Sequence, residues 1–194
     1  MSAIDEILIS VAPGEVRAAL LRRGRLEELM VERRGRESLV GSVYVGRVLR
    51  VLDGLDAAFV ELGGERPGFL TSAEARPARS AGQSDRRGER LSQRLSEGDA
   101  VLVQVIKDPT GDKGPALSLH VTLPGPFLVY APFDGAISVS RRIADAAERD
   151  RLETVVEQLV NAREGVIART SAAGVPDDVI GAELGRLRGI WRGV

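Results

Sequence analysis

The stretch "GSVYVGRVLRVLDGLDAAFVELGGERPGFL", residues Gly41–Leu70, decides the fold of the middle of the chain. It holds six glycines and two of the four phenylalanines of the protein, Phe59 and Phe69. Short apolar runs rich in β-branched residues alternate with the turn-forming stretches "DGLD" and "GGERP". Gly and Pro turns at such short intervals are typical of a curled β-meander.

Two further strands are predicted downstream of this meander, "AVLVQVIK" (100–107) and "PALSLHVTL" (115–123). They are joined by a loop that contains or borders the only two lysines of the chain, Lys107 and Lys113. The intervening segment, about residues 71–98, has almost no large apolar residue, which predicts a long surface loop. Five short strands with one long insertion predict an OB-type five-stranded β-barrel over residues 41–121.

The flanking regions predict an α+β protein around this barrel. Residues 4–33 alternate apolar and polar positions between turns and predict two or three antiparallel strands, although "LEELMVER" (26–33) is also compatible with a helix. "EGVIART" (164–170) predicts another strand. Two amphipathic helices are predicted, and Asp145 and Glu148 are the predicted capping pair of the first helix. The apolar residues at helical spacing are, in the first helix, Leu152, Val155, Val156 and Leu159, and, in the second, Ile180, Leu184, Leu187 and Trp191.

Composition narrows the possible functions. With 194 residues, 43% of them hydrophobic, the chain is long enough to bury a core. Its net charge is −1, so a polyanionic partner would have to bind at a local basic patch. No run approaches a membrane span, and the acidic N-terminus does not resemble a signal peptide, so a cytoplasmic protein is expected. The absence of cysteine and a single histidine, His120, exclude disulfides, Cys-ligated zinc and paired-histidine sites within this chain.

Two groups of residues are candidates for binding nucleic acid. An OB-type barrel binds single strands when exposed aromatic rings stack on bases and nearby cations meet phosphates. Phe59 and Phe69 lie on neighbouring predicted strands, and Lys107 and Lys113 flank a loop that would close over the same face. Because a strand phenylalanine is more often a core residue, spacing alone leaves the ligand of the barrel open.

The second group lies at the end of a predicted strand. Arg169 and Thr170 place a guanidinium beside a hydroxyl, a pair that can grip a terminal phosphate through charge-assisted hydrogen bonds. Arg141 and Arg142 are possible further contacts, and for all three arginines an ordinary solvated side chain is the commoner interpretation. No arrangement of general acid and base stands out, so no catalytic residue and no metal site are predicted.

The series of motifs resembles the N-terminal part of the bacterial ribonuclease E/G family over nearly the full length. The segments that carry the resemblance are "VYVGRVLRVLDGLDAAFVELGGERPGFL", "EGDAVLVQVIKDPTGDKGPALS", "LPGPFLVYAP", "SRRI", "GVIARTSAAG" and the closing tryptophan helix. The resemblance implies that residues 1–40 are the first strands of an RNase H-like subdomain. It also implies that residues 41–121 form an S-one RNA-binding domain of OB type inserted into that subdomain, and that residues 122–194 form a five-prime sensor region.

The resemblance also implies roles for individual residues. Phe59 and Phe69 match base-contacting aromatics of the barrel, and Lys113 matches a basic RNA contact. In the sensor, which recognises the monophosphorylated end of an RNA, Arg169 and Thr170 match the phosphate-gripping pair, and Gly125 and Val129 match the wall of the pocket. The chain departs from the family at Val45, where many members carry a lysine, and in "AISVSRRI", which leaves a role for Arg141 open.

Members of the family cleave RNA with magnesium in a downstream domain, and some share zinc between protomers through cysteines. This chain stops before both segments, so it is expected to need no cofactor and to be inactive as a nuclease by itself. The expected partners are single-stranded RNA and either a downstream catalytic domain or a second copy of the chain. Two alternatives are a free-standing RNA-binding regulator and a protein-interaction module that binds no RNA.

Overall fold

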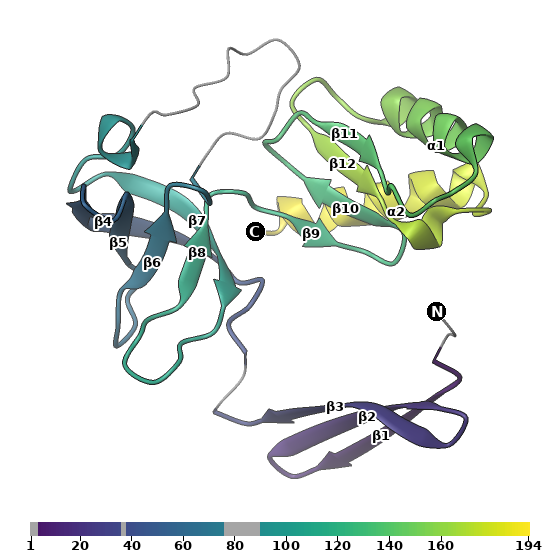
Figure 1. Ribbon diagram of the computed structural model, residues 1–194, viewed down its shortest axis with the longest axis horizontal. Helices are drawn as coiled ribbons and strands as arrows, with labels where there is room; N and C mark the ends of the chain where they lie inside the picture. The colour runs from purple at the N-terminus through teal and green to yellow at the C-terminus, as the bar shows by residue number, and fades with distance from the viewer. Residues whose placement is uncertain (1–3, 36–37, 76–89) are drawn as a thin grey trace. The chain divides into compact units, whose positions relative to one another are not determined.

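The computed structural model describes residues 4–35, 38–75 and 90–194 (Figure 1). The chain divides into two compact units, Met1–Leu39 and Val40–Val194. The first unit is a small sheet. The second contains a β-barrel followed by a four-stranded sheet with two helices.

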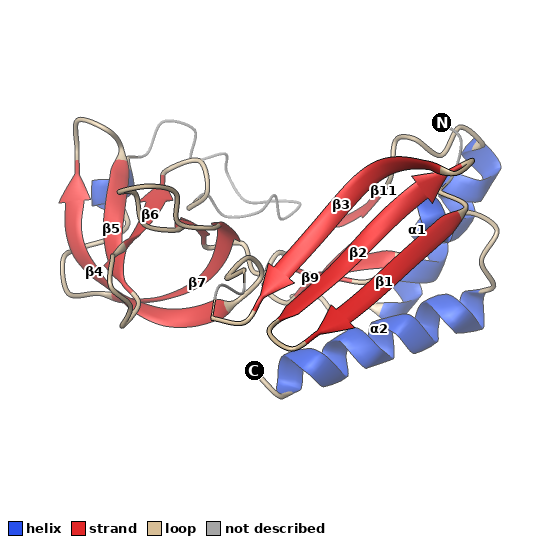
Figure 2. Ribbon diagram, turned by 90° about the horizontal axis from the view of Figure 1, so that it is seen from below, coloured by secondary structure: helices blue, strands red, loops and turns tan. Residues whose placement is uncertain are grey.

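The first unit is an antiparallel sheet of three strands, shown side by side in Figure 2. The strands are β1 (Glu6–Ala12), β2 (Glu15–Arg22) and β3 (Arg25–Arg33), in the order β1-β2-β3. The prediction of strands here is confirmed, and the helical alternative for residues 26–33 is wrong. Those residues pair with β2, with Leu29 opposite Ala19 and Val31 opposite Arg17, because ladder pairing overrides a weak local helical pattern.

Three antiparallel strands occur in many folds, so their assignment to an RNase H-like subdomain over residues 1–40 stays a prediction. The division of residues 41–194 into a barrel domain ending at 121 and a sensor region from 122 likewise stays a prediction.

The predicted OB-type barrel is confirmed. Its strands are β4 (Val43–Leu52), β5 (Ala57–Glu61), β6 (Gly68–Thr71), β7 (Ala100–Lys107) and β8 (Ala116–Ser118). They close in the order β4-β5-β6-β8-β7 (Figure 1). Only the pair β6 and β8 is parallel, and the other four pairings are antiparallel. A five-stranded closed sheet in which the third and fifth strands run parallel has the OB topology.

Side chains that alternate inward along these strands fill the barrel. Val60, Leu70, Val103 and Leu117 are almost completely buried there. Gly68 lies where β6 passes closest to β8, because a Cβ atom at this position would lie 2.4 Å from a methyl carbon of Leu117. This close approach explains why the quoted stretch needs a glycine directly before Phe69.

The predicted loop at about 71–98 is described only at its two ends, and residues 76–89 lie outside the described residues. Its second end contains the short 3-10 helix η1 (Leu91–Gln93). Leu91 is buried, and its backbone N–H donates to the carboxylate of Asp56 at 2.8 Å. At the first end, the carbonyl of Glu74 accepts from the N–H of Leu119 at 2.9 Å. Both ends are therefore fastened to the barrel.

Gln104 ties the end of the barrel to the sheet that follows. Its side chain is buried, its amide nitrogen donates to the carbonyls of Gly41 and Thr122, and its oxygen accepts from the Thr122 N–H at 2.9 Å. These bonds hold the entry and the exit of the barrel together. Close to Thr122 in the sequence, the Nδ1 atom of His120 lies 3.4 Å from a carboxylate oxygen of Asp134. This carboxylate raises the pKa of the His120 imidazole.

The second sheet has four strands in the order β11-β12-β10-β9. They are β9 (Leu123–Pro124), β10 (Leu128–Ala131), β11 (Ile137–Val139) and β12 (Gly165–Ala168). The strand predicted in "EGVIART" is confirmed as β12. Sequence analysis did not predict the other three, because runs of two to four residues are too short to show an alternating pattern.

Two helices cover one face of this sheet, α1 (Ala146–Leu159) and α2 (Asp177–Arg192). The predicted apolar faces are confirmed, because Leu152 and Val156 of α1 and Ile180, Leu184 and Leu187 of α2 are buried in one core with residues of β10 and β12.

The predicted capping pair of α1 is half right. The carboxylate of Asp145 accepts from the N–H groups of Ala147 and Glu148, as an N-cap residue does. The carboxylate of Glu148 instead accepts from the Arg151 guanidinium and the Gly174 N–H. These bonds hold the pKa of Glu148 at about 2. In a capping box the Glu148 carboxylate would accept from the backbone N–H of Asp145. Here Arg151, one turn along the helix, binds that carboxylate instead.

The predicted fourth residue of the α2 face, Trp191, lies at the edge of the same core. It is half-buried, and its ring makes an edge-to-face contact with Phe133, with 5.4 Å between ring centroids. This geometry is a favourable arrangement for an aromatic pair.

A charged network joins α2 to the sheet. The guanidinium of Arg188 donates to the carboxylate of Glu164 at 2.9 and 2.5 Å and to the carbonyl of Leu159 at 2.7 Å. The hydroxyl of Tyr130 donates to the same carboxylate at 2.8 Å. The bond from Arg188 lowers the pKa of Glu164 to about 2, whereas burial, and then the neighbouring carboxylate, raise the pKa of Tyr130 to about 12.

The first prediction concerns this network. Because the pKa of Glu164 is depressed by folding, its contribution to stability is complete above the unfolded pKa and is lost as the pH falls from about 4.5 toward 2. We expect Arg188→Ala to raise the carboxyl pKa of Glu164 in a carbon-13 NMR titration. It should also lower the free energy of unfolding at pH 7 by about 1.5 to 3 kcal/mol, the range for hydrogen bonds to charged groups.

Arg186→Ala is the matched control, because Arg186 is an exposed arginine on the same helix. An unchanged Glu164 titration in Arg188→Ala would contradict the assignment of the pKa shift to this ion pair.

Candidate nucleic-acid interface

Phe59 and Phe69 form a ring pair on the outer face of the barrel. They are directly opposite each other on β5 and β6, and their ring centroids lie 5.6 Å apart with an interplanar angle of 57°. Both are half-buried, whereas their neighbours Val60 and Leu70 point inward and are fully buried. The pair is therefore a partly exposed aromatic surface outside the hydrophobic core.

Two basic side chains extend this ring pair into a row across the barrel. Arg50 on β4 is opposite Phe59, and Lys107 on β7 is opposite Ala116, which is opposite Phe69. Because directly opposite residues lie on the same face of a sheet, Arg50, Phe59, Phe69, Ala116 and Lys107 form one row, which we call the barrel row. Arg50 and Lys107, at its ends, are exposed.

Irregular pairing explains how both cations come to lie in this row. The register of β4 shifts between Val48 and Arg50, and that of β7 shifts between Val105 and Lys107. Val48 and Val105 are buried, so in a regular strand the residue two positions later would also point inward. One extra residue on each strand turns Arg50 and Lys107 to the outer face. Lys107 was predicted from the sequence as a binding residue, but Arg50 was not. A bulge cannot be recognised from the spacing of apolar residues.

Lys113 lies outside the barrel row, in the loop between β7 and β8. It is exposed, and its backbone pairs with Thr110 across a tight turn. Arg66, from the β5–β6 connection, donates to the carbonyl of Gly111 and forms an ion pair with Asp112 at 3.6 Å. The loop is thus fastened beside the start of β6, the strand that carries Phe69.

A second set of polar side chains surrounds a pocket of about 430 Å³ at the ends of β11 and β12. We call it the strand-end pocket. Two arginines, three hydroxyl residues and one apolar residue line it: Arg142, Arg169, Ser140, Thr170, Ser171 and Ile167. The predicted residues Arg169, Thr170 and Arg142 are therefore brought together, and no acidic residue among those that the structure describes lines the pocket.

Hydrogen bonds orient the side chains around the strand-end pocket. The hydroxyls of Ser140 and Thr170 are 2.9 Å apart, and the backbone N–H of Arg142 donates to the Ser140 hydroxyl at 3.3 Å. Arg169 donates one guanidinium N–H to the carbonyl of Gly125 at 2.5 Å. A guanidinium has five N–H groups, so this bond fixes the fork and leaves donors for an anion.

The remaining predicted residues lie around this pocket without lining it. Gly125 provides the carbonyl that anchors Arg169. Val129 is half-buried on β10, opposite the lining residue Ile167 of β12. Arg141 is exposed and is not among the lining residues, although its neighbour Arg142 is.

Residues 124–128, which we call the Gly125 loop, bond to two residues that line the pocket, Arg169 and Ser171. The carbonyl of Phe127 accepts from the backbone N–H of Arg169 at 2.8 Å, and the carbonyl of Pro126 accepts from the hydroxyl of Ser171 at 2.5 Å. On the other side of the loop, the buried carboxylate of Glu183 accepts from the N–H of Phe127. Sequence analysis missed Glu183, which looks like an ordinary surface acid of an amphipathic helix.

The two sites favour the same class of ligand by different chemistry. The barrel row presents rings for stacking and, at its ends, charges for phosphates. The strand-end pocket presents guanidinium and hydroxyl donors, which bind compact anions such as a phosphate group. The chemistry of both sites therefore suits parts of a nucleic acid, bases at the first and a phosphate group at the second.

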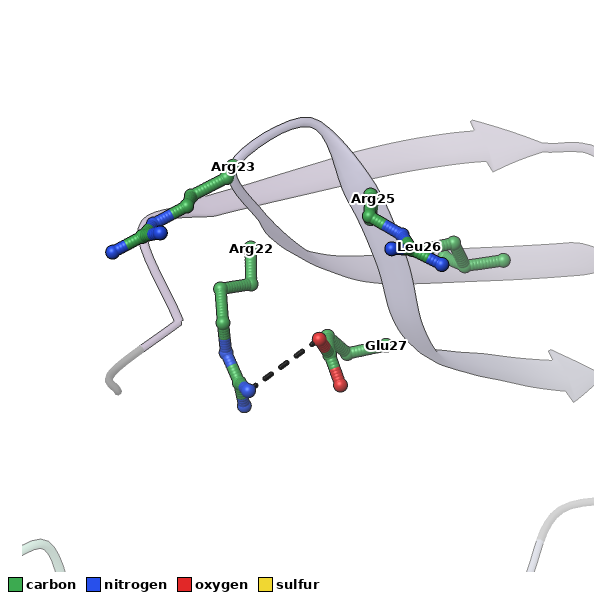
Figure 3. A pocket seen from close by; sticks show the side chains of 5 residues that line it. All are labelled: Arg22, Arg23, Arg25, Leu26 and Glu27. Atoms are coloured by element: carbon green, nitrogen blue, oxygen red, sulfur yellow. Dashed lines mark ion pairs between the residues drawn. The ribbon is translucent and has the colours of Figure 1, made fainter. Parts of the chain in front are cut away.

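A third hollow lies at the tip of the β2–β3 hairpin (Figure 3). It is lined by Arg22, Arg23, Arg25, Leu26 and Glu27, and Arg22 forms an ion pair with Glu27 at 3.5 Å. Figure 3 shows the side chains of Arg23 and Arg25 pointing in different directions. They form no convergent site.

Neither a group of metal-ligating side chains nor a membrane-spanning helix is found in the described part of the chain. Among residues 4–35, 38–75 and 90–194, no three His, Asp or Glu side chains are grouped so that they would hold an ion, and the sequence has no cysteine. No helix in the same ranges is long and apolar enough to cross a membrane.

Comparison with known proteins gives one consistent family. The sequence pattern of the Ribonuclease E/G family matches residues 122–194. Ribonuclease G of Salmonella typhimurium is 36% identical over 190 residues, and ribonuclease G of Escherichia coli K12 is 37% identical over 190 residues. Each alignment covers 96% of this chain and 39% of the relative.

A ribonuclease E shows the same relation. That of a Nostoc species is 36% identical over 178 residues, which cover 91% of this chain and 25% of the relative. The chain thus spans about two fifths of the length of these ribonucleases G and a quarter of this ribonuclease E. Together with the OB-type barrel, these similarities show that the chain belongs to the ribonuclease E/G family.

Proposed function

We propose that this chain binds single-stranded RNA and recognises its five-prime monophosphate, as the RNA-recognition part of a ribonuclease E/G-type endoribonuclease in RNA processing and decay. The observation that carries the proposal is the strand-end pocket, where the described lining consists of Arg142, Arg169, three hydroxyl residues and Ile167, with no acid among them. The sequence motif around Arg169 and Thr170 that matches the family's sensor supports it.

A terminal monophosphate suits this pocket better than an internal diester does. It carries a charge of −1.5 to −2 at neutral pH and three acceptor oxygens, whereas a diester carries a single charge. Arg169 would meet the phosphate with the guanidinium donors that its bond to Gly125 leaves, and Thr170 would add a hydroxyl. A five-prime hydroxyl would lose most of these bonds.

The barrel row supplies affinity for the rest of the strand in this proposal. Phe59 and Phe69 stack on bases, while Arg50, Lys107 and the nearby Lys113 meet phosphates. Such contacts tolerate any base, so the barrel would bind RNA without strong sequence preference, and the pocket would select the end.

We further propose that the nuclease centre, with its magnesium, comes from a part of the longer relatives that this chain does not span. The alignments with the ribonucleases G, which cover 39% of each relative, support this assignment. The chain by itself would then bind RNA without cleaving it.

The second prediction tests the pocket. We expect an equilibrium titration to show tighter binding of a short unstructured RNA with a five-prime monophosphate than of the same RNA with a five-prime hydroxyl. Arg169→Ala should remove this preference and leave the affinity for the hydroxyl RNA unchanged, because the barrel row is intact. Arg142→Ala should reduce the preference.

Arg141→Ala is the matched control, since Arg141 is the neighbouring arginine and does not line the pocket. Equal affinities of the two RNAs for the wild-type chain would contradict five-prime sensing.

The third prediction tests the aromatic rings. We expect Phe59→Ala combined with Phe69→Ala to weaken RNA binding by about 1 to 3 kcal/mol for each base that is no longer stacked. Phe133→Ala should leave RNA binding unchanged, because Phe133 is an exposed phenylalanine outside the barrel. Unchanged affinity of a folded double variant would show that the ring pair is only structural.

The fourth prediction tests the cations of the barrel row. The slope of log affinity against log salt concentration falls by about 0.7 for each lost contact with a phosphate of a single strand. Arg50→Ala combined with Lys107→Ala should therefore make the slope shallower by about 1.4. Arg163→Ala, which removes an exposed arginine elsewhere, serves as control. A slope equal to that of the wild type would exclude both residues as phosphate contacts.

A further inference from the structure

Glu183 is an unusual residue for the middle of an amphipathic helix. Only 7% of its surface is exposed, and it is the one buried acidic residue in the described part of the chain. No lysine, arginine or histidine bonds to its carboxylate among the hydrogen bonds and ion pairs described. Its position on α2 faces the Gly125 loop of the sheet.

The carboxylate is satisfied by backbone N–H groups of that loop. Both of its oxygens accept from the N–H of Phe127 at 3.1 Å, and one of them also lies 3.5 Å from the N–H of Leu128. A buried carboxylate needs such donors, because leaving either partner without its bond is costly. The orientation of the Phe127 and Leu128 peptide groups is therefore coupled to the position of Glu183.

Gly125 makes the close approach of this carboxylate possible. A Cβ atom at position 125 would lie 1.9 Å from a carboxylate oxygen of Glu183, so any other residue here would force that carboxylate to shift. The N–H of Gly125 donates to the carbonyl of Leu128 at 2.7 Å, which closes the loop on itself. Glu183 thus holds one side of a tight loop whose other side bonds to Arg169 and Ser171, two residues that line the strand-end pocket.

The front of the same loop carries the groups that orient Arg169. The carbonyl of Gly125 accepts from the Arg169 guanidinium at 2.5 Å, and the carbonyl of Phe127 accepts from the Arg169 backbone N–H at 2.8 Å. A continuous chain of bonds therefore runs from the Glu183 carboxylate through the Gly125 loop to the guanidinium.

We infer that Glu183 is a positioning residue for five-prime recognition: it holds the Gly125 loop so that Arg169 presents its remaining donors to the terminal phosphate. The inference rests on the proposed function. Packing alone would not require a carboxylate here, because an apolar side chain of similar size would fill the space. The negative charge is needed to hold two backbone donors in place and, through them, the two carbonyls that face Arg169.

Glu183→Gln is the sharpest test. The amide keeps the size of the side chain but replaces one acceptor oxygen with an NH₂ group, which opposes the Phe127 N–H. We expect the ratio of affinities for monophosphate and hydroxyl RNA to fall about tenfold, as for the loss of one well-placed hydrogen bond. The affinity for the hydroxyl RNA should stay at the wild-type value, which separates a positioning role from general damage to the protein.

Glu157→Gln is the matched control, because it makes the same chemical change at an exposed glutamate of α1 and should leave the ratio unchanged. A folded Glu183→Gln variant with the wild-type ratio would overturn the inference and leave the proposed function intact. A wild-type chain without any preference for the monophosphate would overturn both. The wild-type titration therefore distinguishes the two failures.

A measurement on the wild-type chain covers the case in which the variant does not fold. The side-chain carboxyl of Glu183 and the amides of Phe127 and Leu128 are followed by NMR during titration with each RNA. We expect these signals to shift with the monophosphate RNA and to stay in place with the hydroxyl RNA. Signals that respond identically to both RNAs would contradict a link between Glu183 and the terminal phosphate.

Discussion

The hydrogen bonds from the Phe127 and Leu128 backbone to the buried carboxylate of Glu183 are the constraint on which the C-terminal half of the structure depends. They join α2 to the short connection between β9 and β10, and the opposite side of that connection anchors Arg169. The same helix is fixed a second time where Arg188 meets Glu164. A pocket for a small anion needs hydrogen-bond donors that are already in position. The two attachments of α2 hold short strands of the sheet in place and so fix the position of these donors.

The binding surface of the barrel is built in a different way. A closed OB-type sheet has an apolar interior and an outer face on which residues alternate, so a binding surface must be assembled from several strands. Phe59 and Phe69 meet because β5 and β6 pair directly, and two bulges bring Arg50 and Lys107 to the same face. Exposed rings and flexible point charges suit a strand of any sequence, whereas the pocket with its fixed guanidinium suits one compact group.

The sequence was sufficient for the elements with strong periodicity. Alternation and Gly turns predicted the barrel, helical spacing predicted α1 and α2, and the strand before Arg169 was recognisable. What it missed depends on tertiary pairing: β9, β10 and β11 are too short to show a pattern, and the bulge beside Arg50 shifts a face without changing composition. Glu183 was missed for a related reason, because an acid on a helix is usually exposed and its close approach to Gly125 is a tertiary contact.

In the function that we propose, Arg169 holds the terminal phosphate of an RNA, and phosphorus-31 NMR observes that group directly. The second pKa of a free phosphate monoester is about 6. A nearby guanidinium favours the dianion, so we expect the pKa of the five-prime phosphate to fall and its signal to shift when the RNA binds. A five-prime phosphate that keeps its free pKa and its free chemical shift in the bound RNA would show that Arg169 does not hold it.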